Sequence, residues 1–197
     1  MYDYRKMTPE ERAEIVAQRK ACGWPWHAPP HFGGQEELYL ITAACYEHRE
    51  VMAAPTRLTE FAEALVLGLK SDLGIEVQAW VVLPNHYHLL VSTDLDVFRP
   101  WIARIHNGKS TQWNREDRSP GRRVWHRFAD RKIRSEGHYY ASLNYIHANP
   151  VKHGYVEKAD DWPWSSLPGY LEGFGRDVLV DWWKRYPVGD YGRGWDD

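Results

Sequence analysis

The sequence LPNHYHLLV (residues 83–91) decides the fold, because it combines a tight turn with the start of a strand. Its proline and asparagine are typical turn residues. The apolar stretches on either side, 75–83 and 86–93, therefore predict two strands paired in a hairpin. Successive side chains of a strand point to opposite faces, so His86 and His88 project together while the tyrosine between them points away. The hairpin thus predicts a sheet that presents two imidazoles side by side.

The segments around this hairpin alternate between strand and helix patterns. Strand-forming residues fill 38–45 and 124–128, and helical patterns cover 59–70, 98–114 and 135–149, the last ending before Pro150. The order is strand, helix, strand, strand, helix, strand, and then one further helix. This order predicts an α+β fold of the ferredoxin-like type, with helices on one face of an antiparallel sheet.

The two ends of the chain differ in pattern from this central part. The sequence TPEE (8–11) is typical of a helix start, whereas 23–34 has too much Pro and Gly for regular structure. The sequence after Val156 reads as irregular. We therefore predict three parts, which are an N-terminal helical extension with a linker (1–34), a central domain (35–157) and a C-terminal tail (158–197).

Composition and charge bound the class of protein. Two cysteines give no disulfide framework, and we find neither a secretory signal nor an apolar run long enough for a membrane span, so we expect a cytoplasmic protein. The net charge is −2, but residues 99–134 hold eleven Lys and Arg against three acids, a local balance of +8. This distribution favours a face that binds a polyanion, with an ordinary solvated surface as the alternative.

Two motifs have the residue types that chemistry needs. His86 and His88 on one strand face form half of a metal site, although two unrelated histidines would give the same pattern. A structural zinc site is disfavoured because no cysteine lies nearby. In the second motif, YYASLNYIHANP (139–150), Tyr145 and Asn149 share one face of a helix. A tyrosine beside a metal can attack phosphorus, but composition does not distinguish Tyr145 from the other two tyrosines, Tyr139 and Tyr140.

Four blocks together resemble the REP-associated tyrosine transposases, relatives of the single-tyrosine transposases of small bacterial insertion sequences. The blocks are VVLPNHYHLLV (81–91), VWHRFADRKIR (124–134), YIHANPVKHGYV (145–156) and DWPWSS (161–166), and they stand in the family's order over roughly residues 36–170. The resemblance implies the HUH endonuclease fold. It also implies a metal-dependent DNA nickase and strand transferase that works through a 5′-phosphotyrosine.

The resemblance also implies a role for individual residues. His86 and His88 match the family's metal motif, Tyr145 its nucleophile and Asn149 a third ligand, where insertion-sequence relatives often use Gln. His147 is a rival ligand that should face elsewhere on the helix. The implied metal is Mg²⁺ or Mn²⁺. The basic residues expected to contact DNA are Lys109, Arg122, Arg123, Arg127, Arg131, Lys132 and Arg134.

The implied partner is a DNA hairpin with single-stranded flanks, of the repetitive extragenic palindromic type, and the implied location is the bacterial nucleoid. We expect a monomer, with a dimer as the alternative. Two other functions keep the same fold. One is an insertion-sequence transposase of the same class, and the other is a hairpin-binding protein that does not cleave.

Overall fold

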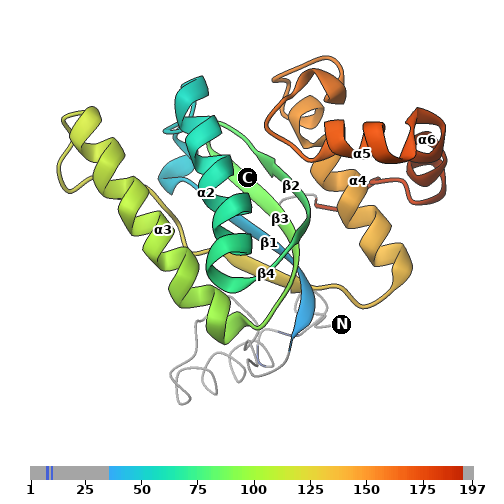
Figure 1. Cartoon of the computed structure of the whole chain (residues 1–197), viewed down its shortest axis with the longest axis horizontal. Helices are drawn as coiled ribbons and strands as arrows, with labels where there is room; N and C mark the ends of the chain where they lie inside the picture. The colour runs from blue at the N-terminus through green and yellow to red at the C-terminus, as the bar shows by residue number, and fades with distance from the viewer. Residues whose placement is uncertain (1–7, 9, 11–35, 193–197) are drawn as a thin grey trace. The chain divides into compact units, whose positions relative to one another are not determined.

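The predicted hairpin lies in the middle of the sheet in a computed structural model that describes Thr8, Glu10 and residues 36–192. Within these described residues, one antiparallel sheet has the strand order β2-β3-β1-β4 (Figure 1). The strands are β1 Glu37–Ala44, β2 Val77–Val82, β3 His86–Thr93 and β4 Ala129–Lys132. The helices are α2 Pro55–Leu73, α3 Leu95–Glu116, α4 Glu136–Lys152, α5 Leu167–Phe174 and α6 Arg176–Arg185, with 3₁₀ turns η2 Tyr46–His48 and η3 Ala159–Asp161. The order of the elements and of the strands is ferredoxin-like, so the predicted α+β fold class is confirmed.

Strand β3 is central in the sheet, since it pairs with β2 on one side and β1 on the other, and its side chains are buried on both faces. The turn before it closes where the Leu83 N–H donates to the His86 carbonyl over 2.8 Å. In the register with β1, His88 stands opposite Thr42 and His86 opposite Ala44. Paired residues of antiparallel strands point to the same face, so Thr42 lies beside His88.

Helices cover both faces of the sheet, which corrects the expectation of helices on one face only (Figure 1). Helices α2 and α3 cover the face of Tyr87, whose ring lies 5.3 Å from that of Phe61 on α2 and whose hydroxyl lies 3.2 Å from Nε2 of His106 on α3. Helix α4 covers the opposite face, which carries His86 and His88. The second layer is required because β3 has buried side chains on both faces.

Strand β4 lies one segment later than predicted, at Ala129–Lys132 instead of 124–128. Val124 and Trp125 are buried in the core, but Trp125 forms only an isolated bridge, with Cys45 directly after β1. The true strand has the sequence ADRK and no apolar alternation. Charged residues suit it because an edge strand must avoid pairing with other chains, and that removes the sequence pattern of a strand.

Helix α4 continues through Pro150 to Lys152, three residues past the predicted end at 149. Proline lacks the N–H that bonds the carbonyl four residues earlier, and this usually ends a helix. Here the missing bond falls in the last turn. The His153 N–H still donates to the Asn149 carbonyl over 3.0 Å, and Pro150 is buried. The extra turn therefore remains helical.

The C-terminal part is more regular than predicted, since residues expected to be irregular form α5 and α6. Both helices are short, α5 contains Pro and Gly, and Gly175 separates it from α6, which hides them in the sequence. The carbonyls of Trp182 and Tyr186 accept hydrogen bonds from the buried Asn144 amide at 3.1 and 2.8 Å, which ties α6 to α4.

The DWPWSS block runs along the free edge of β2. Val82 N–H donates to the Trp164 carbonyl and Ser166 N–H to the Trp80 carbonyl, both at 2.9 Å. The division into three parts remains a prediction, and the predicted N-terminal helix lies outside the described residues apart from Thr8 and Glu10. Of the helices described, none has the length and apolar character needed to span a membrane.

Candidate nucleophile and metal site

His86 and His88 lie side by side on β3, as strand alternation requires. Their ring centroids are 5.1 Å apart with the rings nearly perpendicular, and both side chains are buried. The Nδ1 atom of each ring has a close polar neighbour. His86 Nδ1 lies 2.7 Å from Asn85 Oδ1, and His88 Nδ1 lies 2.7 Å from Thr42 Oγ1. In both histidines Nε2 therefore lies on the part of the ring that faces away from the neighbour of Nδ1.

Helix α4 brings Tyr145 and Asn149 to the two histidines. The Tyr145 ring lies edge-on to His88 at a centroid distance of 5.0 Å, and Asn149 Oδ1 lies 3.0 Å from His86 Nε2. All four side chains are buried. Residues 57 to 63 positions apart in the sequence therefore meet between one strand and one helix.

The structure separates Tyr145 from the other tyrosines of α4. Tyr140 stacks on Tyr186 at 4.9 Å, and Tyr139 contacts Tyr140 edge-on at 5.2 Å. These two rings pack away from the histidines. His147 also faces away, with Nε2 2.9 Å from Ser166 Oγ, and burial lowers its pKa to about 3. Among the tyrosines of this helix, Tyr145 is the one that contacts His88.

The convergence of His86, His88 and Asn149 gives two imidazole nitrogens and one amide oxygen. Among the described residues, no group of three or more His, Cys, Asp or Glu side chains could hold a metal, so the amide is needed for a third protein ligand. Asn149 Nδ2 is buried and has no hydrogen-bond partner among the residues described. A mixed nitrogen and oxygen set of this kind fits a divalent cation such as Mn²⁺ or Mg²⁺.

Sequence reasoning missed two residues that extend the same face of α4. The His153 ring lies 4.8 Å from that of His86, and Lys152 Nζ lies 5.0 Å from the centre of the Tyr145 ring. His153 follows Asn149 by four residues, and Lys152 follows Tyr145 by seven. Helical spacing alone would have placed both beside the site.

Residues near the C-terminus cover Tyr145. The Tyr191 ring lies 5.7 Å from the Tyr145 ring, and a Cβ added to Gly192 would come within 2.1 Å of Tyr145 Cε2. Gly192 has φ +79°, a conformation that favours glycine. Tyr145 is 1% exposed as a result. Exposure of the Tyr145 ring therefore requires this covering segment to move.

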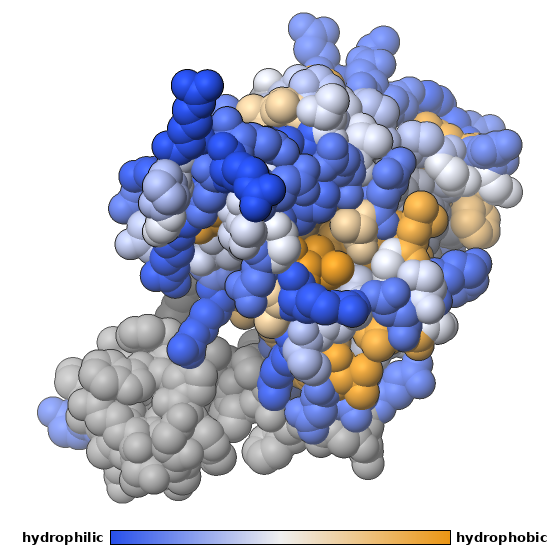
Figure 2. Space-filling model, turned by 60° about the vertical axis from the view of Figure 1, so that its left-hand side comes forward, coloured by the Kyte–Doolittle hydropathy of each residue, from blue (hydrophilic) through white to orange (hydrophobic). Residues whose placement is uncertain are grey.

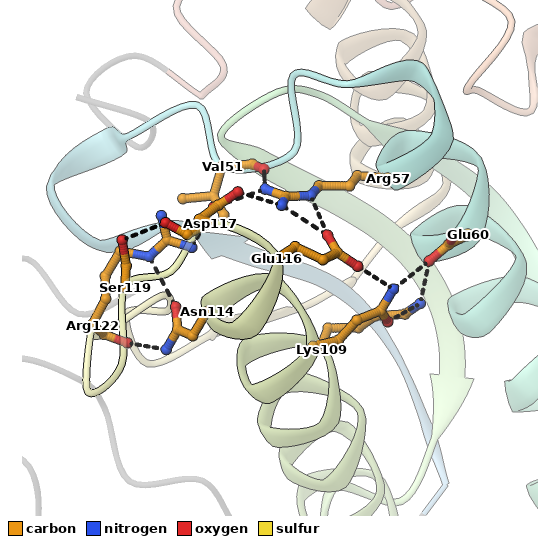
Figure 3. Close-up of polar contacts among 10 residues, drawn as sticks. Val51, Arg57, Glu60, Lys109, Asn114, Glu116, Asp117, Ser119 and Arg122 are labelled. Carbon is orange, nitrogen blue, oxygen red and sulfur yellow. Dashed lines mark hydrogen bonds and ion pairs between the residues drawn. The ribbon is translucent and has the colours of Figure 1, made fainter.

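Several of the basic residues expected to contact DNA are neutralised by acids. Figure 3 shows Lys109 bonded to Glu60 at 3.0 Å and Arg122 bonded to Asp117 at 2.7 Å. Lys132 pairs with Glu37 at 2.5 Å. Arg57 joins this network and lowers the pKa of the Asp117 carboxyl to about 2. The +8 balance of the middle segment is therefore partly cancelled in the folded protein.

Other basic residues remain accessible. Arg123, Arg127 and Arg134 are exposed and form no salt bridge with another described residue, and Arg131 is exposed on the edge strand β4. The Arg123 guanidinium lies 4.5 Å from the centre of the Tyr46 ring. The face seen in Figure 2 is mainly hydrophilic, with apolar residues in small groups. These arginines are the accessible part of the predicted DNA surface.

No protein-family model matches the chain. The REP-associated tyrosine transposase of Escherichia coli K12 is 32% identical over 128 residues, which cover 59% of this chain and 68% of that protein. The chain belongs to the REP-associated tyrosine transposase family.

Two further comparisons are with a second related sequence and with a solved structure. A protein with the same family name from Haemophilus influenzae is 35% identical over 117 residues, which cover 54% of this chain and 62% of that protein. The solved structure of a REP-associated tyrosine transposase bound to a REP hairpin matches with a TM-score of 0.57 and 23% identity, over 74% of this chain and 85% of that one. This structural likeness supports the fold.

Proposed function

We propose that this family member is a metal-dependent single-strand DNA endonuclease and strand transferase. It acts on repetitive extragenic palindromic hairpins with single-stranded flanks, and Tyr145 is the nucleophile. The observation that carries the proposal is the packing of Tyr145 against His88, 5.0 Å between ring centroids, on the face that also holds His86 and Asn149. A protein that only binds a hairpin has no chemical need for this combination.

The chemistry of the chain's own residues is a phosphoryl transfer to Tyr145. The phenol loses its proton as its oxygen forms a bond to phosphorus, and the bond from phosphorus to the 3′ oxygen breaks. That oxygen takes up a proton and leaves as a 3′-hydroxyl, while the other DNA end stays attached as a 5′-phosphotyrosine. His86, His88 and Asn149 would hold Mg²⁺ or Mn²⁺, which when bound would polarise the phosphate and offset charge on the leaving oxygen.

The substrate class follows from the geometry that this attack requires. An in-line approach to phosphorus needs a flexible backbone, which single-stranded DNA provides. The relative of known structure was solved with a REP hairpin, which supports a hairpin with single-stranded flanks as the substrate here. Because the phosphotyrosine conserves the energy of the phosphodiester, a 3′-hydroxyl can reverse the attack and no nucleotide cofactor is needed.

A labelled hairpin with single-stranded flanks tests the proposal directly. Incubation with the protein and Mn²⁺ should give a free 3′-hydroxyl fragment and a covalent adduct, with the label on the Tyr145 peptide after proteolysis and mass spectrometry. Cleavage that leaves a free 5′-phosphate and no adduct would overturn the proposed mechanism. Binding without cleavage under any divalent cation would favour the binding protein instead.

Replacing Arg123 by Gln should weaken hairpin binding and reduce its salt dependence. Each lost phosphate contact lowers the slope of log affinity against log salt by about 1. The measurement is hairpin affinity over a salt series. Lys109→Gln is the matched control, because Glu60 already neutralises Lys109 and its slope should change little. Equal slopes for wild type and the Arg123 variant would place the DNA elsewhere.

Replacing Gly192 by Ala should speed cleavage. The new methyl group cannot share space with the Tyr145 ring, so the covering segment must move away. A strain of about 1–2 kcal/mol at a left-handed residue corresponds to about a tenfold gain in the open population. Single-turnover cleavage rates measure the effect.

Gly121→Ala is the control for this variant, since Gly121 has the same φ of +79° but has open space around it. It should leave the rate unchanged. A slower rate in the Gly192 variant would mean that the segment assists Tyr145 and does not block it.

A further inference from the structure

Asn85 connects His86 to a strained turn. Its Oδ1 lies 2.7 Å from His86 Nδ1, and its Nδ2 donates to the His48 carbonyl over 3.2 Å. That carbonyl belongs to the turn η2, in which Glu47 and His48 have φ of +55° and +51°. Residues other than glycine adopt this conformation at an energetic cost, and such strain collects at functional sites.

The two contacts of Asn85 fix the orientation of its amide. A carbonyl oxygen only accepts hydrogen bonds, so the group that faces the His48 carbonyl must be the NH₂. The amide oxygen then faces His86 Nδ1, and this oxygen also only accepts. The hydrogen bond therefore requires the proton on Nδ1 of His86.

This assignment determines the state of the other ring nitrogen. In a neutral imidazole with its proton on Nδ1, Nε2 carries a lone pair. His86 Nε2 lies 3.0 Å from Asn149 Oδ1, which also only accepts, so this contact taken alone would place the proton on Nε2. Unlike Asn85, however, Asn149 has no second contact that fixes its amide, because its Nδ2 has no hydrogen-bond partner among the described residues. The Asn149 amide can therefore turn and donate from Nδ2 to the Nε2 lone pair. A lone pair on Nε2 is what binding to a cation requires, and the opposite tautomer would present a hydrogen there.

The second histidine lacks such a strict constraint. Thr42 Oγ1 lies 2.7 Å from His88 Nδ1, but a hydroxyl can donate or accept, so it is compatible with either tautomer. Asn85 is thus the residue that specifies a tautomer at this site. A main-chain hydrogen bond also holds Asn85 in place, because the Cys45 N–H donates to the Asn85 carbonyl over 2.7 Å.

We propose that Asn85 is a positioning residue that holds His86 in the Nδ1–H tautomer, with η2 holding Asn85 in turn, so that Nε2 is available to a divalent metal. The inference rests on the proposed function, since it assigns a residue to the metal site of that reaction. Partners of metal-binding histidines act in this way by fixing the tautomer and the ring orientation. A role in turn formation alone predicts no effect on the tautomer.

Two readouts on the full chain test this inference, and neither depends on cleavage. Nitrogen-15 NMR of the metal-free protein should show His86 as the Nδ1–H tautomer in wild type and a mixture in Asn85→Ala. Electron paramagnetic resonance with Mn²⁺ alone should show affinity lowered by about 10–100-fold in Asn85→Ala. Asn85→Asp keeps an acceptor for Nδ1–H and should restore most of the affinity.

Asn114→Ala is the matched control. Asn114, in the last turn of α3, also makes two hydrogen bonds to the following loop, with Nδ2 donating to the Arg122 carbonyl at 2.8 Å and Oδ1 accepting from Arg122 Nε at 2.9 Å, but it lies away from His86. It should leave the tautomer and the Mn²⁺ affinity unchanged.

Three outcomes would overturn the inference. They are an Nε2–H tautomer of His86 in wild type, an unchanged tautomer and affinity in Asn85→Ala, and equal losses in Asn85→Ala and Asn114→Ala. If wild type holds the expected tautomer but forms no adduct with DNA, the proposed reaction fails while the positioning role of Asn85 stands. If Asn85→Ala does not fold, the His86 tautomer in the wild-type spectrum and the Mn²⁺ affinity of Asn85→Asp still test the inference.

Discussion

Replacing Tyr145 by Phe is expected to lower cleavage of a hairpin with single-stranded flanks by about 10⁴-fold or more while hairpin affinity stays nearly constant. The change removes one oxygen atom, which in the proposed reaction is the atom that bonds to phosphorus. Loss of a nucleophile typically has an effect of this size. The ring remains in place against His88, so packing of α4 on the sheet should be preserved. Gel assays of cleavage and binding with the same oligonucleotide measure both quantities.

The control for this variant is Tyr140→Phe. Tyr140 lies on the same helix, but its ring stacks on Tyr186 away from the histidines. Its hydroxyl has no place in the proposed reaction, so cleavage should stay at the wild-type rate. Cleavage by Tyr145→Phe at a comparable rate, or an adduct on a different tyrosine, would show that the nucleophile has been assigned wrongly.

The central hairpin could be predicted from the sequence because its signals are local. A Pro-Asn turn between two apolar stretches sets both strands, and period-two alternation sets the face of His86 and His88. The edge strand β4 could not be found in the same way. It consists of ADRK at 129–132, and its partner β1 is distant in the sequence. Its pairing depends on tertiary contacts and not on its own composition.

The candidate site also has a part that local spacing predicts and a part that only tertiary packing determines. Spacing on a strand brings two imidazoles together, and spacing on a helix puts Tyr145 and Asn149 on one face. Nothing local determines which face of α4 meets the sheet, so spacing alone could not choose Tyr145 over Tyr140. The choice follows from packing, because Tyr140 fills the contact with Tyr186 on the C-terminal side. In the sequence analysis, the resemblance to the REP-associated tyrosine transposases was the basis for choosing Tyr145.

Replacing His86 or His88 by Ala is expected to lower Mn²⁺ affinity by about 100-fold or more and to remove metal-dependent cleavage. Even residues that only support a metal ligand typically change affinity by about 10–100-fold, and a direct ligand should matter at least as much. Asn149→Ala should give a smaller loss, because it removes one amide oxygen that water can replace. Titration with Mn²⁺ in the absence of DNA measures affinity separately from chemistry.

His147→Gln is the control for these variants, since it is a buried histidine whose ring contacts Ser166 on the other side of α4. It should reduce stability but leave Mn²⁺ affinity and cleavage per folded molecule unchanged. Thermal unfolding of all four variants separates loss of fold from loss of metal. If His86→Ala and His88→Ala bind Mn²⁺ as wild type does, or if cleavage persists in excess chelator, the two histidines do not hold the metal. Because Tyr145→Phe should retain full Mn²⁺ affinity, the two sets of variants together distinguish a failed metal site from a failed nucleophile.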